Sequence, residues 1–208
     1  MKEGQDYIRD IAEMRSMMER SSKFLSLSGL AGIMAGTYAL LGAFIAYRVF
    51  HFNSAEIANN VSDHGILTED LLKIFFLAII TLILAVSTAI FLSQKKALKR
   101  GQKLWDHTAK RLLINMSVPL VAGGLLVLIL ILKGLVALMA PFTLIFYGLA
   151  LYNASKLTYG EVRSLGIIQI VLGLVSAYFV EYGLLCWAIG FGVFHIIYGI
   201  YMHYRYER

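Results

Sequence analysis

Six apolar stretches, each long enough to cross a lipid bilayer, occupy most of this 208-residue chain. The hydrocarbon core of a bilayer is about 30 Å thick, so a spanning helix needs roughly 20 mostly apolar residues. Backbone polar groups inside lipid must be hydrogen-bonded within the protein, which favours helices over open strands. We therefore predict an all-α, polytopic membrane protein with six transmembrane helices in one bundle over residues 25–208. The predicted spans cover about 25–47, 71–93, 112–132, 135–154, 164–181 and 183–203.

The distribution of lysine and arginine predicts how the chain is oriented. Of the 19 Lys and Arg residues, all but Arg48, Lys73 and Lys133 fall on the side of the predicted spans that also holds both termini. Loops on the cytoplasmic side of a membrane carry an excess of these residues. We therefore expect both termini in the cytoplasm. The net charge of +6 then reflects membrane topology, and nucleic-acid binding is not expected.

The segment before the first span, residues 1–24, has the pattern of an amphipathic cytoplasmic helix. Tyr7, Ile11, Met14 and Met18 recur at helical spacing on one face, and acidic residues occupy an adjacent face. The segment is polar, so it lacks the layout of a cleaved signal peptide. We interpret it as a helix lying against the membrane or the bundle. A docking helix for a soluble partner is the alternative.

The connection at 94–111 is rich in basic residues, and we expect it to lengthen the second and third spans as helix beyond the membrane surface. A basic residue near the surface attracts anionic lipid by about 1 kcal/mol. The residues expected to lie near anionic lipid are Lys95, Lys96, Lys99, Arg100 and Lys103.

Glycines recur at seven-residue intervals in the first, fifth and sixth predicted spans. Helices in lipid associate through close packing, and small residues let their backbones approach. A seven-residue period keeps those small residues on one seam, so we predict that these three spans form the tight core of the bundle or an oligomer interface. The helix-packing candidates are Gly29, Gly32, Gly36, Gly166, Gly173, Gly183, Gly190, Gly192 and Gly199.

His195 is the one ionisable residue near the middle of any predicted span. If the last two spans form a hairpin that turns at Tyr182, Gln169 lies at the same depth as His195. The two side chains can then exchange a hydrogen bond between helices, and a polar group in lipid is expected to face inward. Tyr198 and Tyr178 are predicted to extend this polar patch. Two hypotheses remain open, namely a structural clasp and a ligand or proton site.

Both prolines of the chain fall within the third and fourth predicted spans. Proline removes a helix hydrogen bond and kinks the helix. We therefore predict kinks at Pro119, which Gly123 and Gly124 follow closely, and at Pro141. Broken helices build the binding sites of many transporters, so these four residues are candidate hinges.

Residues that carry chemistry are otherwise scarce within the spans. The sequence lacks a metalloprotease motif, a phosphate-binding loop and a nucleophile elbow, and its single cysteine, Cys186, cannot form a disulfide framework. We expect no catalytic residue, no metal site and no cofactor. A redox protein with a cofactor bound at His195 is a third hypothesis.

Two sequence runs resemble segments of uncharacterised bacterial six-span inner-membrane proteins. They are Tyr147–Lys156, with the sequence YGLALYNASK, and Gly190–Gly199, with the sequence GFGVFHIIYG. The resemblance covers mainly the C-terminal third of the chain, and it implies a location in a bacterial inner membrane. It implies no activity and no functional residue.

These observations favour a non-enzymatic integral membrane module that acts as a sensor, regulator or assembly partner. We expect such a module to form a homo-oligomer or a hetero-complex and to meet a protein partner in the cytoplasm. The alternative is a small transporter or channel for a weakly polar substrate, which would use the level of Gln169 and His195 and the kinked third and fourth spans.

Overall fold

The computed structural model describes residues 28–52, 69–99, 101 and 105–207 of the chain. In those ranges it has six helical segments long and apolar enough to cross a membrane, and it has no strand. The prediction of an all-α, polytopic membrane fold with six spans is therefore confirmed. The amphipathic helix predicted at 1–24 lies outside the described residues.

Four spans are single helices, namely α2 (Gly29–Arg48), α4 (Glu69–Lys99), α5 (His107–Leu132) and α7 (Glu161–Tyr178). The fourth span joins a 3₁₀ turn (Val136–Leu138) to α6 (Met139–Ala154). The last span joins α8 (Gly183–Trp187), a π-helical segment (Ala188–Phe194) and α9 (His195–Tyr206). One regular helix was expected there. The wider π turns contain two poor helix formers, Gly190 and Gly192.

The helices on either side of the basic 94–111 connection are longer than the apolar stretches alone. α4 continues to Lys99, and α5 begins at His107. The Asp106 side chain caps α5, because its Oδ1 atom accepts a hydrogen bond of 2.7 Å from the Ala109 N–H. The expected extension of both helices beyond their apolar stretches is thus confirmed.

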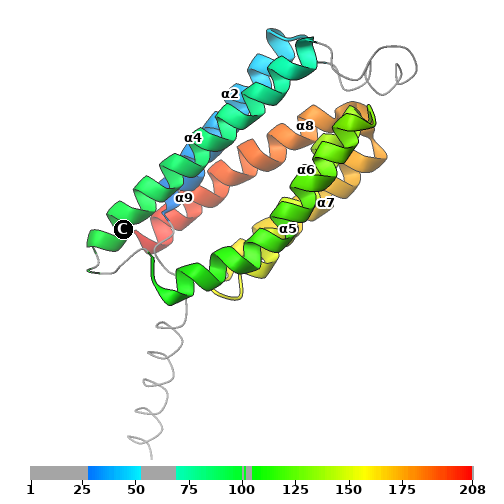
Figure 1. Ribbon diagram of the computed structural model, residues 1–208. Coiled ribbons are helices and arrows are strands. Elements are labelled where there is room, and N and C mark those ends of the chain that lie inside the picture. The colour runs from blue at the N-terminus through cyan, green and yellow to red at the C-terminus, as the bar shows by residue number, and fades with distance from the viewer. Residues whose placement is uncertain (1–27, 53–68, 100, 102–104, 208) are drawn as a thin grey trace, which may run out of the picture.

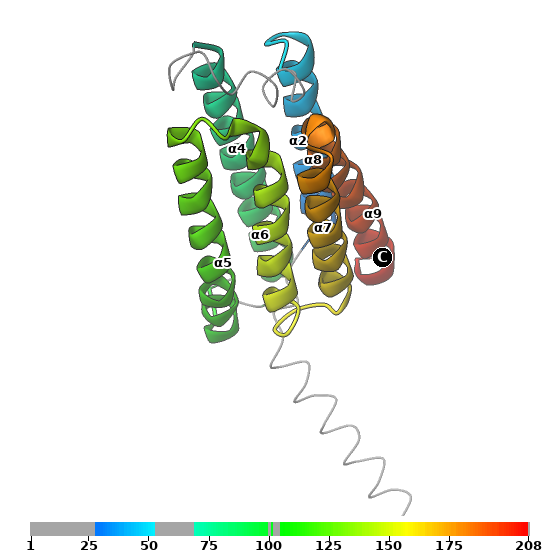
Figure 2. The same ribbon diagram turned by 90° about the vertical axis from the view of Figure 1, so that its right-hand side faces the viewer.

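The spans form two groups that the last span connects (Figures 1 and 2). In the first group, α2 packs between α4 and α9. In the second group, α6 packs between α5 and α7, and α8 contacts both α6 and α7. The last span therefore begins against the second group and ends against α2 of the first group, as Figure 1 shows.

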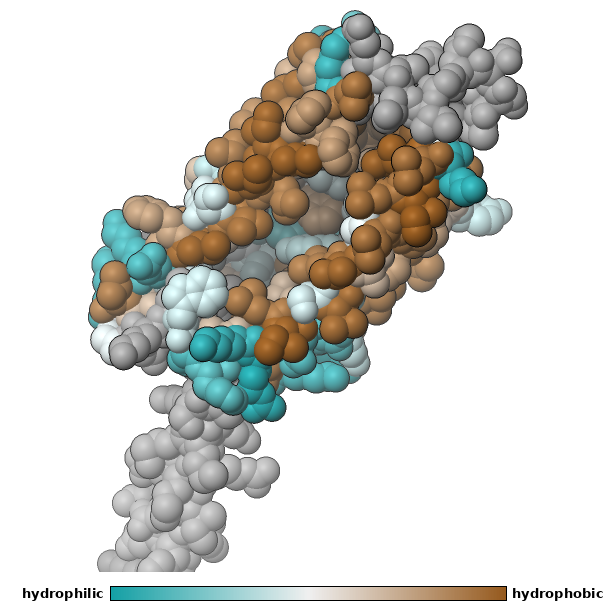
Figure 3. Space-filling view, viewed as in Figure 1, coloured by the Kyte–Doolittle hydropathy of each residue, from teal (hydrophilic) through white to brown (hydrophobic). Residues whose placement is uncertain are grey.

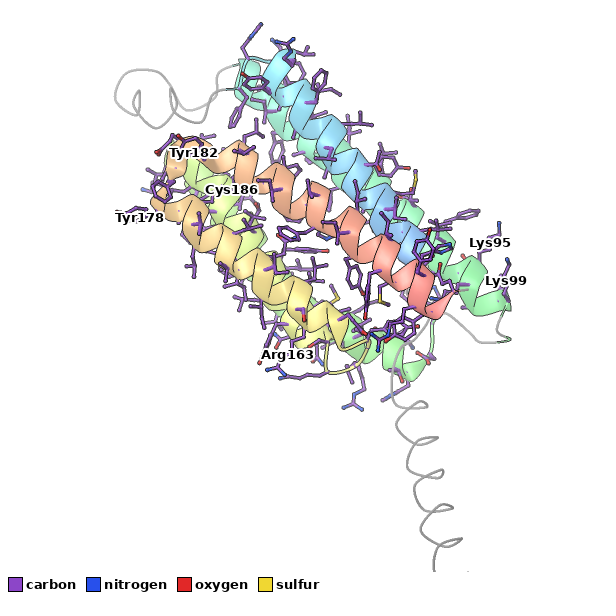
Figure 4. All side chains as sticks on the ribbon, turned by 180° about the vertical axis from the view of Figure 1, so that it is seen from behind. Lys95, Lys99, Arg163, Tyr178, Tyr182 and Cys186 are labelled. Carbon is purple, nitrogen blue, oxygen red and sulfur yellow. The ribbon has the colours of Figure 1, made fainter. Side chains whose placement is uncertain are left out.

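The two ends of the bundle differ in their side chains (Figure 4). Lys95, Lys99 and Arg163 lie at one end, which we call the basic end. Tyr178 and Tyr182 lie at the opposite end, which we call the aromatic end.

Tight turns join consecutive spans at the aromatic end. α5 ends at Leu132, and Gly134 follows two residues later with a positive φ of 73° that suits glycine. The Leu135 N–H bonds back to Leu130 O over 2.8 Å. This turn makes α5 and α6 an antiparallel hairpin. A short 3₁₀ turn, Val180–Tyr182, likewise joins α7 to α8.

Glycines allow α2 and the last span to pack with their backbones in contact. A Cβ atom on Gly36 would lie 2.6 Å from Gly192 O, and one on Gly199 would lie 2.6 Å from Gly29 O. Such distances are too short for any side chain, so these positions require glycine. Gly32 lies on the same seam, and a Cβ atom on Gly32 would lie 3.1 Å from the Gly199 Cα.

The glycines of α7 form a separate seam, which corrects the prediction of one core from the first, fifth and sixth spans. A Cβ atom on Gly166 would lie 2.8 Å from Gly148 O of α6, and one on Gly173 would lie 2.9 Å from Pro141 O. α7 therefore packs on α6 rather than on α2. The prediction was wrong because the regular spacing of glycines indicates that a helix has a close-packing face, but it does not identify the helix that packs on that face. Gly190 faces Gln169 and Leu144, and Gly183 is buried at the start of α8.

The two prolines lie in different structural settings. Pro119 is buried inside α5, which continues as one helix from His107 to Leu132. Pro141 lies in the first turn of α6, where backbone N–H groups have no intrahelical partner. The kink predicted in the interior of the fourth span is therefore wrong for Pro141. Gly123 packs on Phe146 of α6, whereas the position of a Cβ atom on Gly124 would be open.

The two groups are tied together in the half of the bundle nearer the basic end. Met202 of α9 packs in a hydrophobic core with Leu112 of α5, Leu151 of α6 and Leu165 of α7. At the end itself, the Glu207 carboxylate accepts a hydrogen bond of 2.8 Å from the Gly29 N–H of α2. It also lies 2.9 Å from Lys96 Nζ of α4 and 2.6 Å from His203 Nδ1.

This ion pair changes the expectation for anionic lipid. The Lys96 side chain is only 11% exposed and pairs with Glu207. The prediction that Lys96 lies near anionic lipid headgroups is therefore wrong. Apolar packing of α4 on α2 carries Lys96 inward, one turn from the exposed Lys99. Lys95 and Lys99 remain candidates for contact with lipid. Arg100 and Lys103 lie outside the described residues.

Candidate functional site

A polar centre lies in the middle of the bundle, where α6, α7 and the last span meet. Gln169 of α7 is fully buried, and His195 is only 6% exposed. The Gln169 Nε2 atom lies 3.4 Å from His195 Nδ1. The two side chains thus lie at one depth, as the hairpin geometry predicts.

The hydrogen bonds of this centre converge on the carbonyl group of Gly190 in the π-helical segment. Gly190 O accepts a hydrogen bond of 2.8 Å from Gln169 Nε2 and lies 3.0 Å from His195 Nδ1. If Nδ1 carries the proton and donates to this carbonyl, Nε2 is an acceptor. The Tyr147 hydroxyl lies 2.8 Å from Nε2 and supplies the matching donor.

Tyr147 of α6 is the member of this centre that the sequence did not predict. The turn at Tyr182 relates the depths of α7 and the last span, but it contains no information about α6. One signal was present, because Tyr147 falls well inside a span, away from the membrane surface where tyrosine usually lies. A hydroxyl at that depth needs a hydrogen-bond partner.

The two tyrosines proposed to extend the patch have different surroundings. Tyr198 is half-buried, and its hydroxyl oxygen is buried with no hydrogen-bond partner among the described residues. Tyr178 is 81% exposed at the aromatic end of α7, so its proposed place in the patch is wrong. It lies nine residues after Gln169, which at 3.6 residues per turn puts it on the opposite face of the helix.

An aromatic column runs from the polar centre towards the aromatic end. Trp187, Phe191 and His195 follow one another at four-residue spacing along the last span. The Trp187 and Phe191 ring centroids are 5.0 Å apart, and those of Phe191 and His195 are 5.8 Å apart. Tyr147 packs beside Phe191, with 4.9 Å between the ring centroids.

The column ends in a cleft of about 410 Å³ between the two helix groups, in the half of the bundle nearer the aromatic end. α4 and α5 supply its opposite walls, and Trp187 and Leu184 contribute from the last span. Figure 3 shows the hollow on this face, with mostly hydrophobic side chains around it. The lining residues include Gly42, Ala43, Ala46, Ala78, Ala137 and Ala140.

The lining of the cleft offers almost no hydrogen-bonding groups. Its two hydroxyl side chains belong to Thr81 and Thr143. Each hydroxyl donates to a carbonyl group of its own helix over 2.8 Å, at Leu77 and at Ala140 respectively. The cleft is therefore suited to an apolar ligand.

The size of the cleft suits a small molecule. Its volume lies within the range of small-molecule sites, which is about 300–1,000 Å³. Its apolar lining suits the hydrocarbon part of such a molecule.

The predicted hinge residues do not line the cleft. Its walls in α5 and α6 are formed by neighbouring residues such as Leu128 and Ala140. Among the residues that the structure describes, no group of three His, Cys, Asp or Glu side chains could hold a metal ion.

Comparisons with known protein families, with curated proteins and with solved structures give no match to this chain.

Proposed function

We propose that this chain is a non-enzymatic integral membrane module, a sensor or regulator that responds to an apolar ligand bound in the cleft between its two helix groups. The cleft carries this proposal. It is apolar, its hydroxyl groups are already bonded, and it lies between two helix groups that are tied together nearer the basic end. Filling the cleft is then expected to change the separation of α4 and α5.

The polar centre supports a structural role within this module. The side chains of Gln169 and His195 are buried, and the Gly190 carbonyl and the Tyr147 hydroxyl bond Gln169 Nε2 and both ring nitrogens of His195. Gln169 Oε1 is buried with no hydrogen-bond partner among the described residues. We propose that the centre clasps α6 and α7 to the last span. The clasp fixes the second helix group on one side of the cleft.

We further propose that the module lies in a bacterial inner membrane with its basic end and both termini in the cytoplasm. The concentration of Lys and Arg at the basic end supports this orientation. Residues 1–24 would then be available to a cytoplasmic protein partner, in a homo-oligomer or a hetero-complex. Deleting residues 1–22 should abolish capture of that partner and leave the bundle folded.

A second candidate function is transport of a weakly polar substrate. The observation that favours it is the aromatic column, which links the cleft to His195. Transport predicts that His195→Ala lowers substrate flux into proteoliposomes at equal protein content. Ligand sensing predicts that binding in the cleft survives this change.

Fluorescence of Trp187 tests binding in the cleft directly. The chain has two tryptophans, so Trp105→Phe leaves Trp187 as the sole fluorophore, which we call the cleft reporter. The matched control, which we call the surface reporter, carries its only tryptophan at residue 185, where Leu185 is 57% exposed. It combines the substitutions Trp105→Phe, Trp187→Phe and Leu185→Trp. A brominated lipid at low mole fraction should quench the cleft reporter more strongly. Equal quenching of the two reporters would contradict binding in the cleft.

Filling the cleft provides the second arm of this test. Ala140→Phe places a large side chain in the lining and should remove the excess quenching of Trp187. The control is Val121→Phe, since Val121 is 59% exposed on α5 and does not line the cleft. Circular dichroism of both variants shows whether the bundle remains folded.

A further inference from the structure

The few basic residues at the aromatic end lie next to the cleft. Lys73 stands between the lining residues Leu72 and Ile74 of α4, and Lys133 directly follows the lining residue Leu132 of α5. The two lysines thus belong to opposite walls, and both are exposed. Arg48, also exposed, follows the lining residue Ala46 by two positions.

Basic residues are unusual at this end of the molecule. The other Lys and Arg residues of the described helices lie towards the basic end, as the positive-inside pattern requires. A lysine near the end of a span extends its apolar stem along the helix and its ammonium group towards the headgroups. Lys73 and Lys133 therefore bring positive charge to the membrane surface beside an apolar cleft.

These two features together match the chemistry of a phospholipid, which joins apolar chains to a phosphate group. We propose that the cleft binds an acyl chain of a phospholipid from the leaflet at the aromatic end, and that Lys73 and Lys133 attract its phosphate. Glu181 is exposed at the same end, so the surface there carries both signs of charge. This inference rests on the proposed function, because it names the ligand of the same cleft.

Two brominated lipids with the same acyl chains test the inference on the full-length cleft reporter. One is a phosphatidylglycerol, whose phosphate gives the head group a negative charge, and the other is a diacylglycerol, which lacks the phosphate. Each is added at low mole fraction to proteoliposomes of unbrominated lipid, and quenching of Trp187 is measured. We expect the phospholipid to bind more tightly by about fivefold for each contributing lysine.

Equal affinity for the two lipids would overturn the role of the phosphate while leaving the apolar cleft site intact. If neither lipid quenches the cleft reporter more than the surface reporter, the proposed function itself fails. The two failures are therefore distinguishable.

Charge-removing substitutions identify the residues involved. Lys73→Gln and Lys133→Gln should each lower the affinity for the phospholipid by about fivefold and leave that for the diacylglycerol unchanged. Lys99→Gln, at the basic end, is the matched control and should change neither affinity. A Lys133→Gln variant with wild-type preference for the phospholipid would overturn the assignment.

Discussion

The hydroxyl group of Tyr147 lies 2.8 Å from Nε2 of His195, between residues that are 48 positions apart in the chain. This hydrogen bond joins the middle of α6 to the last span. The other ring nitrogen of His195 lies 3.0 Å from Gly190 O, which also accepts from Gln169 of α7. The imidazole ring therefore links α6 to the last span, and the Gly190 carbonyl links the last span to α7.

A double-mutant cycle measures this link. Tyr147→Phe removes the hydroxyl, and His195→Phe keeps a ring at the second position. Hydrogen bonds between transmembrane helices average about 0.6 kcal/mol and reach about 1.7 kcal/mol. We expect a coupling free energy in that range from unfolding in mixed detergent micelles. Additive effects of the two substitutions would mean that the contact contributes nothing to stability.

The glycine seam between α2 and the last span predicts a large difference between two chemically identical substitutions. Gly36→Ala forces a methyl group to within 2.6 Å of Gly192 O, whereas Gly124→Ala meets no atom within 4 Å. Overpacking typically costs about 1–3 kcal/mol, so Gly36→Ala should destabilise the bundle by this amount. Gly124→Ala should be neutral or stabilising because alanine favours helix. Similar unfolding free energies for the two variants would contradict the close approach of the helices.

The Glu207 carboxylate predicts a dependence of stability on pH. Burial raises the pKa of Glu207, but hydrogen bonds from His203, Lys96 and the Gly29 N–H outweigh burial and lower the pKa from 4.5 to about 2. A depressed native pKa means that the stabilisation is present above the unfolded-state pKa and is lost as the pH falls through the native one. We expect it to decline between about pH 5 and pH 2.

Comparison with Glu207→Gln tests this prediction. At neutral pH the variant should lose roughly 1.5–3 kcal/mol of unfolding free energy, the usual contribution of a hydrogen bond to a charged group. The difference from the wild type should narrow as the pH falls below about 5. Glu181→Gln, which alters an exposed carboxylate at the other end, serves as the control. A difference that does not change with pH would contradict the depressed pKa.

Labelling of introduced cysteines tests the proposed orientation. Cys186 is 7% exposed, and Cys186→Ala removes it as a background. In intact bacterial cells, a membrane-impermeant maleimide should label Tyr182→Cys at the aromatic end. It should label Lys99→Cys only after the cells are broken. The opposite pattern would place the basic end outside the cytoplasm.

The sequence by itself determined the six spans, the extended ends of α4 and α5, and the shared depth of Gln169 and His195. Each of these depends on local properties, namely the number of apolar residues needed to cross a bilayer, the basic composition of the 94–111 connection, and the length of the turn at Tyr182.

Only the tertiary structure decided which faces meet. It paired Tyr147 with His195, set α7 on α6, brought Lys96 to Glu207 and left a cleft between α4 and α5. The physical reason is that lipid is as apolar as a helix interface, so a transmembrane helix can be apolar on its buried and lipid-facing sides alike. Hydropathy therefore locates the spans but does not identify their neighbours, which are selected by the packing of small residues and by a few buried hydrogen bonds.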